Sequence, residues 1–153
     1  MPEPLTAGDL CTRSVVTASR TMGVAEAARL MREKHVGCLV IVDEMAIGCV
    51  PVGMLTDRDI VTEIVAKGVD ARSLSVEDVM SAEPAVADAS ETVLDVLAGM
   101  RRKGVRRLPV VDACGVLQGI LALDDVLEAV AEQLGAFVQA MQSGRAHELQ
   151  RRP

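Results

Sequence analysis

The chain has 153 residues, of which 50% are hydrophobic and 25% charged, a composition that predicts a globular fold and excludes a disordered chain. Its net charge is −6 and it has one aromatic residue, so we expect no nucleic acid polymer as a partner, because such polymers bind to basic surfaces and aromatic platforms. There is no run of 18 apolar residues and no charged-then-apolar leader, so we expect a cytoplasmic protein that does not enter a membrane.

Each half of the chain shows the same order of predicted elements. The first half contains a strand at 15–17, a helix after Gly23, two strands at 38–42 and 50–55, and a helix from Asp57. The second half contains a strand at 85–87, a helix after Thr92, two strands at 108–111 and 116–121, and a helix from Asp124. This order predicts a duplicated unit with the sequence β-α-β-β-α.

Individual residues confirm that the two halves are repeats. A shift of 69 aligns Asp9 with Asp78 and Val42-Asp43 with Val111-Asp112, and a shift of 66 then aligns Asp59 with Asp125. The change of shift falls in a loop, where length changes are tolerated. We divide the chain into a first repeat (1–67), a linker (68–75), a second repeat (76–130) and a C-terminal helical extension with a tail (131–153).

The repeat also predicts how the units pack. A single unit has helices on one face of its sheet, so the other face needs cover, which its twin can supply. We therefore expect an α+β fold in which two β-α-β-β-α repeats pack sheet to sheet about a pseudo-two-fold axis. This arrangement creates two related clefts, one at each junction between a strand and its following helix.

The first junction contains the stretch Gly53-Met-Leu-Thr56-Asp-Arg58-Asp59. One interpretation is a capping box, in which Thr56 and Asp59 satisfy free backbone N–H groups of the first helical turn. The other is a nucleotide site. A helix N-terminus, a hydroxyl and the Arg58 cation favour phosphate, while the Asp59 carboxylate can accept hydrogen bonds from two ribose hydroxyls.

The second junction differs from the first at two positions. It keeps Asp125, but Ala122 replaces the hydroxyl and Asp124 replaces the cation. Conversely, Arg106 and Arg107 begin a strand of the second half where the first half has Gly37-Cys38, and guanidinium groups are well suited to phosphate. The sequence therefore predicts one composite site, with tighter binding of phosphate-bearing ligands at the first junction.

Other chemistry has less support. The four cysteines, at 11, 38, 49 and 114, contain no C-x-x-C pair, and we interpret them as reduced, although a metal or redox sensor stays an alternative. We find no Ser-His-Asp or Cys-His arrangement, so we expect no enzyme and no covalently bound cofactor.

The C-terminal helix carries an apolar stripe formed by Val126, Val130, Leu134, Phe137, Val138 and Met141. We expect Ser143-Gly144 to end the helix and the residues from 145 to 153 to be frayed. Because the stripe is longer than one unit can cover, it is either core or a helix–helix contact. We expect a homodimer that uses Val130, Leu134 and Phe137.

Three stretches accompany the two repeats: Val-Glu-Asp-Val-Met from Val76, Arg-Arg-Leu-Pro-Val-Val-Asp from Arg106, and the Gly-h-h-Thr-x-x-Asp junction, where h is a hydrophobic residue. On these stretches and the two repeats, the chain resembles a tandem cystathionine-beta-synthase (CBS) domain pair, or Bateman module. The resemblance covers about residues 5–130 and is to a stand-alone, bacterial-type member. It implies a regulatory module that binds AMP, ADP or ATP in its interdomain clefts, dimerises through its CBS modules and C-terminal helix, and acts on an unidentified protein partner.

The resemblance also implies roles for individual residues. The final Asp of the junction motif, here Asp59, would hold the ribose, and Thr56 would contact phosphate, as would Arg106 and Arg107. The residues expected to contact a ligand are Val16, Thr17, Val36, Gly37, Thr56, Arg58, Asp59, Val86, Arg106, Arg107, Pro109 and Asp125. The alternatives are a constitutive dimerisation scaffold with degenerate sites, and a sensor of S-adenosylmethionine, NAD, metal or redox state.

Overall fold

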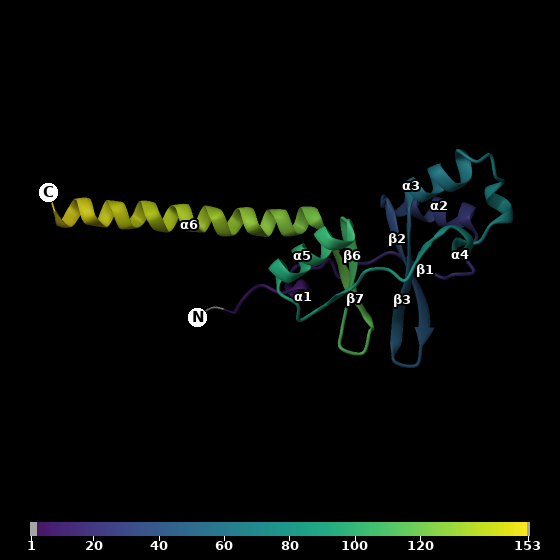
Figure 1. Cartoon of the computed structure of the whole chain (residues 1–153), viewed down its shortest axis with the longest axis horizontal. Coiled ribbons are helices and arrows are strands. Elements are labelled where there is room, and N and C mark those ends of the chain that lie inside the picture. Colours follow the sequence, from purple (N-terminus) through teal and green to yellow (C-terminus); the bar gives the residue numbers. More distant parts are fainter. Residues whose placement is uncertain (1–2, 153) are drawn as a thin grey trace.

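The computed structural model describes residues 3–152, which form two small sheets, short helices around them and one long C-terminal helix (Figure 1). The first sheet has the order β1 (Thr17–Ala18), β2 (Cys38–Met45), β3 (Gly48–Thr56) and β4 (Ser81–Ala82). The second has the order β5 (Ala87–Asp88), β6 (Arg107–Val111) and β7 (Leu117–Ala122). In both, a parallel pair is followed by an antiparallel hairpin. The predicted α+β fold built from two β-α-β-β-α repeats is confirmed.

The first helix of each repeat lies where its signals predict. Helix α2 (Val24–Lys34) follows Gly23, and α5 (Val93–Lys103) follows Thr92, whose hydroxyl accepts a hydrogen bond from the Asp95 backbone N–H. Each buries a stripe at helical spacing, formed by Val24, Ala27 and Met31 in α2 and by Val93, Val96 and Met100 in α5. Both helices therefore cover one face of their own sheet.

The second helices of the two repeats have unequal lengths. After β3, α3 (Asp57–Ile60) continues into a π-helical turn (Val61–Val65), and a short 3-10 helix (Ala71–Ser73) lies in the linker. After β7, α6 runs without a break over Leu123–Arg151. The duplicated units have thus diverged most at their C-terminal helices.

Residues that alternate along the central strands face the two sides of each sheet. Leu39 and Ile41 belong to the core of the first unit, whereas the intervening Val40 is fully buried on the opposite face. In the second sheet Leu108 and Val110 belong to the core of the second unit, whereas the intervening Pro109 is fully buried on the opposite face. These second faces cover each other, as the repeat predicts.

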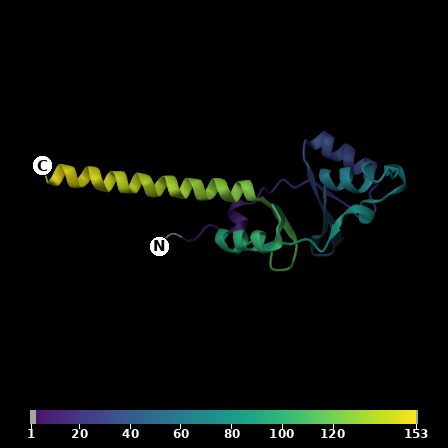
Figure 2. The ribbon, with the colours of Figure 1, turned by 45° about the horizontal axis from the view of Figure 1, so that its top comes forward.

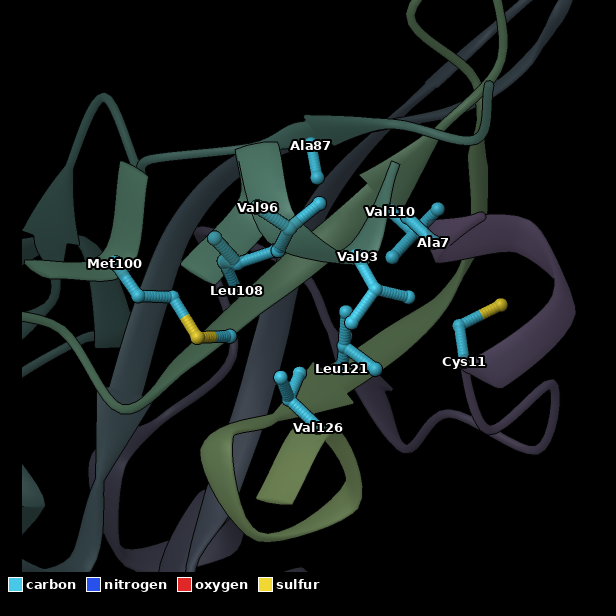
Figure 3. Packing of buried hydrophobic residues seen from close by; sticks show 10 residues of the cluster. All are labelled: Ala7, Cys11, Ala87, Val93, Val96, Met100, Leu108, Val110, Leu121 and Val126. Carbon is cyan, nitrogen blue, oxygen red and sulfur yellow. The ribbon is translucent and has the colours of Figure 1, made fainter. Parts of the chain in front are cut away.

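Two short helices that the sequence analysis did not identify link the repeats. Helix α1 (Ala7–Leu10) lies at the start of the first repeat but packs in the core of the second, where Ala7 and Cys11 lie among Val93, Leu121 and Val126 (Figure 3). Helix α4 (Val76–Val79) lies at the start of the second repeat but packs in the core of the first. Each repeat therefore completes its core with the segment that leads into the other.

Two glycines allow these lead-in segments to cross the sheets. A Cβ atom on Gly53 would lie 2.5 Å from the Met80 sulfur, and one on Gly119 would lie 2.6 Å from the Cys11 sulfur. Next to them, β4 pairs with β3, and Thr12 pairs with Ile120 of β7. The two crossings occupy equivalent positions of the repeat, in agreement with the pseudo-two-fold symmetry.

Helix α6 extends away from both sheets (Figures 1 and 2). The prediction that Ser143-Gly144 ends it is wrong: the helix continues to Arg151, because the following Ala146, Glu148 and Leu149 are good helix formers and no proline intervenes before that residue. Every residue from 131 to 152 is exposed. Among residues 3–152, no helix is both long and apolar enough to span a membrane.

Candidate ligand-binding site

A cavity of about 380 Å³ lies between the two repeats and is lined by both. The first repeat contributes Cys38, Met54, Thr56 and Asp59. The other wall is formed by the chain that enters the second repeat and by the start of β6, comprising Ser81, Ala82, Glu83, Pro84, Ala85, Val105, Arg106 and Arg107. The cavity thus joins the complete junction motif of one repeat to the arginine pair of the other.

Thr56 and Asp59 form the capping box that their spacing predicts. The Thr56 hydroxyl accepts a hydrogen bond from the Asp59 N–H at 3.1 Å, and Asp59 Oδ2 accepts one from the Thr56 N–H at 2.9 Å. Both side chains are half-buried and face the cavity. Within residues 3–152, Asp59 Oδ1 accepts no hydrogen bond, so half of this carboxylate is available to a donor in the cavity.

The electrostatics of Cys38 indicate how charges are placed around the cavity. Burial raises the pKa of the Cys38 thiol to about 11, the Arg107 charge opposes this rise, and the carboxylates of Asp59 and Asp57 add to it. Arg107 and Asp59 are therefore each close enough to Cys38 to act on its thiol, and both line the cavity. An anion that enters here meets a guanidinium opposite the helix N-terminus that Thr56 caps.

Arg106 connects the cavity with the start of α6. Its guanidinium Nη2 lies 4.0 Å from Asp124 Oδ1, and both side chains are more than 80% exposed, so this ion pair is weak and can be exchanged for another. The Arg106 carbonyl accepts a hydrogen bond from the Leu123 N–H at 2.7 Å. The first repeat has the same contact between the Gly37 carbonyl and the Asp57 N–H at 2.9 Å.

The wall from Ser81 to Ala85 was not predicted from the sequence. Glu83 has a φ of 51°, which is uncommon for a residue other than glycine, and its N–H donates to the Val52 carbonyl at 3.3 Å. This bond holds the segment against β3, next to the two-residue pairing of β4. Two residues in the sequence could have indicated this wall. Gly53 leaves space for a crossing segment, and Pro84, two residues after Ala82, marks a turn of the chain.

Several predicted contact residues lie elsewhere. Arg58 is exposed and does not line the cavity, Pro109 is fully buried within the sheet, and Val86 is exposed. Val16 and Val36 pack against the core of the first repeat, and Thr17 lines a separate, open depression with Arg20 and Asp43. Gly37 lies beside Asp57, where a Cβ atom would be 3.0 Å from its carboxylate.

The second junction has a different chemical character. Asp125 Oδ2 accepts a hydrogen bond from the Ala122 N–H at 3.1 Å, but Ala122 offers no hydroxyl in return. Asp125 lies at a shallow hollow of about 170 Å³ with Glu128 and Glu132, so an anion would meet three carboxylates there. Arg106 and Arg107 open instead onto the cavity that contains Thr56 and Asp59.

Metal ligands do not gather in the described part of the chain: residues 3–152 contain no cluster of three or more His, Cys, Asp or Glu side chains suited to a metal ion. All four cysteines are free thiols. Cys11 is buried in the core of the second repeat, and Cys38 lines the cavity. The polar side chains that line the cavity are therefore the carboxylates of Asp59 and Glu83, the hydroxyls of Thr56 and Ser81, the two guanidinium groups and the protonated Cys38 thiol.

Comparison with known proteins places this geometry in context. The family model of the CBS domain matches residues 7–66 and 76–132. The chain is 36% identical over 121 residues to the uncharacterized protein MK0525 of Methanopyrus kandleri, covering 79% of this chain but only 60% of that protein. It is 36% identical over 118 residues to the CBS domain-containing protein YhcV of Bacillus subtilis, covering 77% and 80% of the two chains.

Solved structures share the fold. The hexameric CBS-CP12 protein from bloom-forming cyanobacteria superposes with a TM-score of 0.73 and 30% identity, over 82% of this chain and 68% of that one. The cytosolic domain of the Mg2+ channel MgtE, solved in complex with ATP, superposes with a TM-score of 0.68 and 28% identity, over 81% of this chain and 48% of that one.

Proposed function

The chain belongs to the CBS domain family, and we propose that it is a non-catalytic regulatory module that binds an adenine nucleotide in the cavity between its repeats. Pairs of CBS domains commonly serve as ligand-binding regulatory modules. In this chain the ligand would be a phosphate-bearing adenosine compound such as AMP, ADP or ATP, and its presence would be signalled to a partner protein.

One observation carries this proposal: Thr56 and Asp59 line the same cavity as Arg106 and Arg107. The free Asp59 oxygen can accept from a ribose hydroxyl, and the guanidinium groups can bind phosphate oxygens in a bidentate manner. Apolar side chains such as Met54 and Val105 line the rest of the cavity, where an adenine base can pack against them. The volume of about 380 Å³ falls within the usual range for a small-molecule site.

The fold comparison supports the class of ligand. The MgtE domain, which is 28% identical to this chain, was solved with ATP bound. The local chemistry supports a single occupied site, because the acidic surroundings of Asp125 disfavour phosphate at the second junction. We therefore propose one nucleotide per chain, bound at the first junction.

Arg106 offers a route by which occupancy is signalled. Its side chain can pair either with a phosphate in the cavity or with Asp124 at the first turn of α6. A phosphate that attracts Arg106 removes a cation from Asp124, while the backbone bond from Leu123 to Arg106 links strand and helix mechanically. Binding in the cavity would thus change the charge at the base of α6, the element that is most accessible to a partner.

Calorimetric titration of the purified chain with AMP, ADP, ATP, S-adenosylmethionine and NAD, each in turn, and with adenosine as a phosphate-free reference, tests the proposal. We expect saturable binding of at least one adenine nucleotide, with a stoichiometry of one per chain and weaker binding of adenosine, which lacks the phosphate. Absence of binding by all five compounds would reject the proposal and favour a constitutive scaffold. Tighter binding of adenosine than of its nucleotides would reject the role of the arginines.

A further inference from the structure

We propose that α6 pairs with α6 of a second copy of this chain in an antiparallel orientation, centred near Val138. This inference concerns the exposed length of α6 and does not depend on nucleotide binding. It rests on four features of α6: its exposure, its apolar stripe, the position of its charges and the symmetry of both about one residue.

The exposed part of α6 needs a stabilising partner. Residues 131–151 span about 30 Å at ~1.5 Å per residue, and none of them is buried against the rest of the chain (Figure 2). Most helical stability in proteins comes from packing of an apolar face, and a helix interior loses about 1 kcal/mol for each glycine relative to alanine. Gly135 and Gly144 both lie in this segment.

The exposed stripe of α6 differs from the one expected from the sequence: it shares Leu134, Val138 and Met141 with it but adds Leu127 and Leu149. Leu127, Leu134 and Met141 are spaced by seven residues and are 66%, 63% and 67% exposed. Val138 lies between the last two on the same side, and Leu149 extends the stripe by two more turns. A seven-residue apolar repeat is the pattern of a helix that packs along another helix.

This stripe is separate from the side of α6 that serves its own chain. Val126 and Ala129 are buried, and Val130 packs against the core of the second repeat. Leu127 is turned by about 100° from Val126 around the helix axis, so the stripe begins beside the core rather than in it. Val130, expected at the dimer contact, is thus used by its own core, whereas Leu134 is free to pair.

The distribution of charge selects the orientation. The first turns of α6 contain Asp124, Asp125, Glu128 and Glu132, and residues 133–144 contain no charged side chain. The end of the helix contains Arg145 and Arg151 with one acid, Glu148, and Arg152 follows directly after it. In a parallel pair, the acidic ends would lie together and repel each other. In an antiparallel pair, the acidic end of each helix meets the basic end of its partner.

The apolar stripe has the same symmetry as the charges. Leu127 lies eleven residues before Val138, and Leu149 lies eleven after it. Leu134 lies four before and Met141 three after, while Asp124 and Arg152 are each fourteen residues away. An antiparallel pair centred at Val138 therefore places Leu127 opposite Leu149, Leu134 opposite Met141, and Asp124 opposite Arg152. A surface that is its own complement is what a two-fold homodimer requires.

Disulfide trapping tests the orientation. We would use full-length chains in which the exposed Cys114 is replaced by Ser, and introduce Leu127→Cys and Leu149→Cys separately. An equal mixture of the two variants should form a covalent dimer that contains one chain of each, since residues brought within about 7 Å between Cα atoms can be bridged. Neither variant alone, nor the Cys114→Ser parent, should form it. Cross-linking of Leu127→Cys with itself, or no cross-link in the mixture, would overturn the proposal.

Sedimentation tests the surface itself. Val138→Asp places a carboxylate at the centre of the contact and should weaken dimerisation by at least tenfold. Ser143→Asp adds the same charge to the same helix, turned by about 140° from Val138, and should leave dimerisation within twofold of the parent. Both residues are exposed, so circular dichroism should show a folded chain in each case. A monomeric parent, or equal association of the two variants, would refute the proposal.

Discussion

At the scale of single residues, Asp59 shows how one carboxylate can serve both the fold and a ligand. Its Oδ2 atom closes the capping box with the Thr56 N–H, and its Oδ1 atom accepts no hydrogen bond from residues 3–152, in a side chain that lines the cavity. The two interpretations of the junction motif, a helix cap and a nucleotide site, are therefore compatible. The cap holds the carboxylate in place before a ribose arrives, so little side-chain entropy is lost on binding.

Replacement of Asp59 by Asn separates these two tasks. The Asn side-chain oxygen can still accept from Thr56, so we expect the free energy of unfolding to change little. Hydrogen bonds to a charged acceptor contribute about 1.5–3 kcal/mol, so nucleotide affinity measured by calorimetry should fall by about ten- to over a hundredfold. The control is Asp57→Asn, which removes the same charge from the same turn outside the cavity and should keep most of the affinity. Similar losses in both variants would contradict a specific ribose contact.

At the scale of elements, the start of α6 lacks the cap that its counterpart has. The Thr56 hydroxyl accepts from the helix at the first junction, whereas Ala122 cannot do so at the second. Ala122→Thr should therefore raise the free energy of unfolding by about 0.5–2 kcal/mol, and Thr56→Ala should lower it by a similar amount. Urea denaturation measures both. A stability of Ala122→Thr at or below that of the parent would show that position 122 has no room for the cap.

The crossing of the lead-in segments makes a second prediction at this scale. A methyl group at position 119 would lie 2.6 Å from the Cys11 sulfur and 2.7 Å from the Thr12 carbonyl oxygen, which is backbone and cannot easily move. Gly119→Ala should cost about 1–3 kcal/mol of unfolding free energy, the usual penalty of overpacking. Gly99→Ala, in the open interior of α5, should instead stabilise by up to about 1 kcal/mol. Equal effects of the two substitutions would contradict the tight crossing.

The elements also show what the sequence could and could not predict. Helices α2 and α5 were predicted because their apolar residues recur at helical spacing after a capping position, and the strands of the two hairpins because they are apolar runs bounded by turns. Helices α1 and α4 have four residues each, too few for a periodic signal, and their packing partners lie in the other half of the chain. Local pattern contains no information about which core such a short segment joins.

The same distinction applies to the site. The spacing of Thr56 and Asp59 encodes their contact directly, and the resemblance to CBS domain pairs implied that Arg106 and Arg107 face a cleft, as they do. In contrast, Val16 and Val36 pack in the core, because an apolar residue beside a cleft has the same sequence signal as one in the interior. Ser81, Ala82 and Pro84 line the cavity through the path of the backbone, which only the crossing of the chain determines.

At the scale of the whole molecule, stability should depend on pH through a set of hydrogen-bonded carboxylates. Hydrogen bonds from Thr6, Arg20, Arg72 and Ser90 lower the pKa of Asp9, Asp43, Asp70 and Asp88, respectively, below the usual 3.8. The four carboxylates therefore bind protons less tightly in the folded state than in the unfolded state. Their contribution to stability is complete above about pH 5, where the unfolded carboxylates are ionised too, and is lost as the pH falls through the lowered values.

Urea midpoints between pH 3 and pH 8 measure this dependence. We expect these carboxylates to cause no change between pH 5 and 8 and a decline in stability below about pH 4. Asp43→Asn removes the partner of Arg20, which also lies 3.8 Å from Glu77 of α4. This variant should be less stable than the parent at pH 7 and should lose less on acidification. A parent whose midpoint is unchanged down to pH 3 would show that these hydrogen bonds do not distinguish the folded from the unfolded state.

The exchanged lead-in helices also determine the order in which the chain can mature during its synthesis. Residues 7–11 leave the ribosome early but find their packing partners Leu121 and Val126 only after most of the chain has been made. At a translation rate of about 5–20 residues per second, this delay is on the order of ten seconds. During that time α1 has no core of its own, and the first sheet waits for α4. Neither repeat can complete its core without a segment of the other, so both are complete only after residue 126 has left the ribosome.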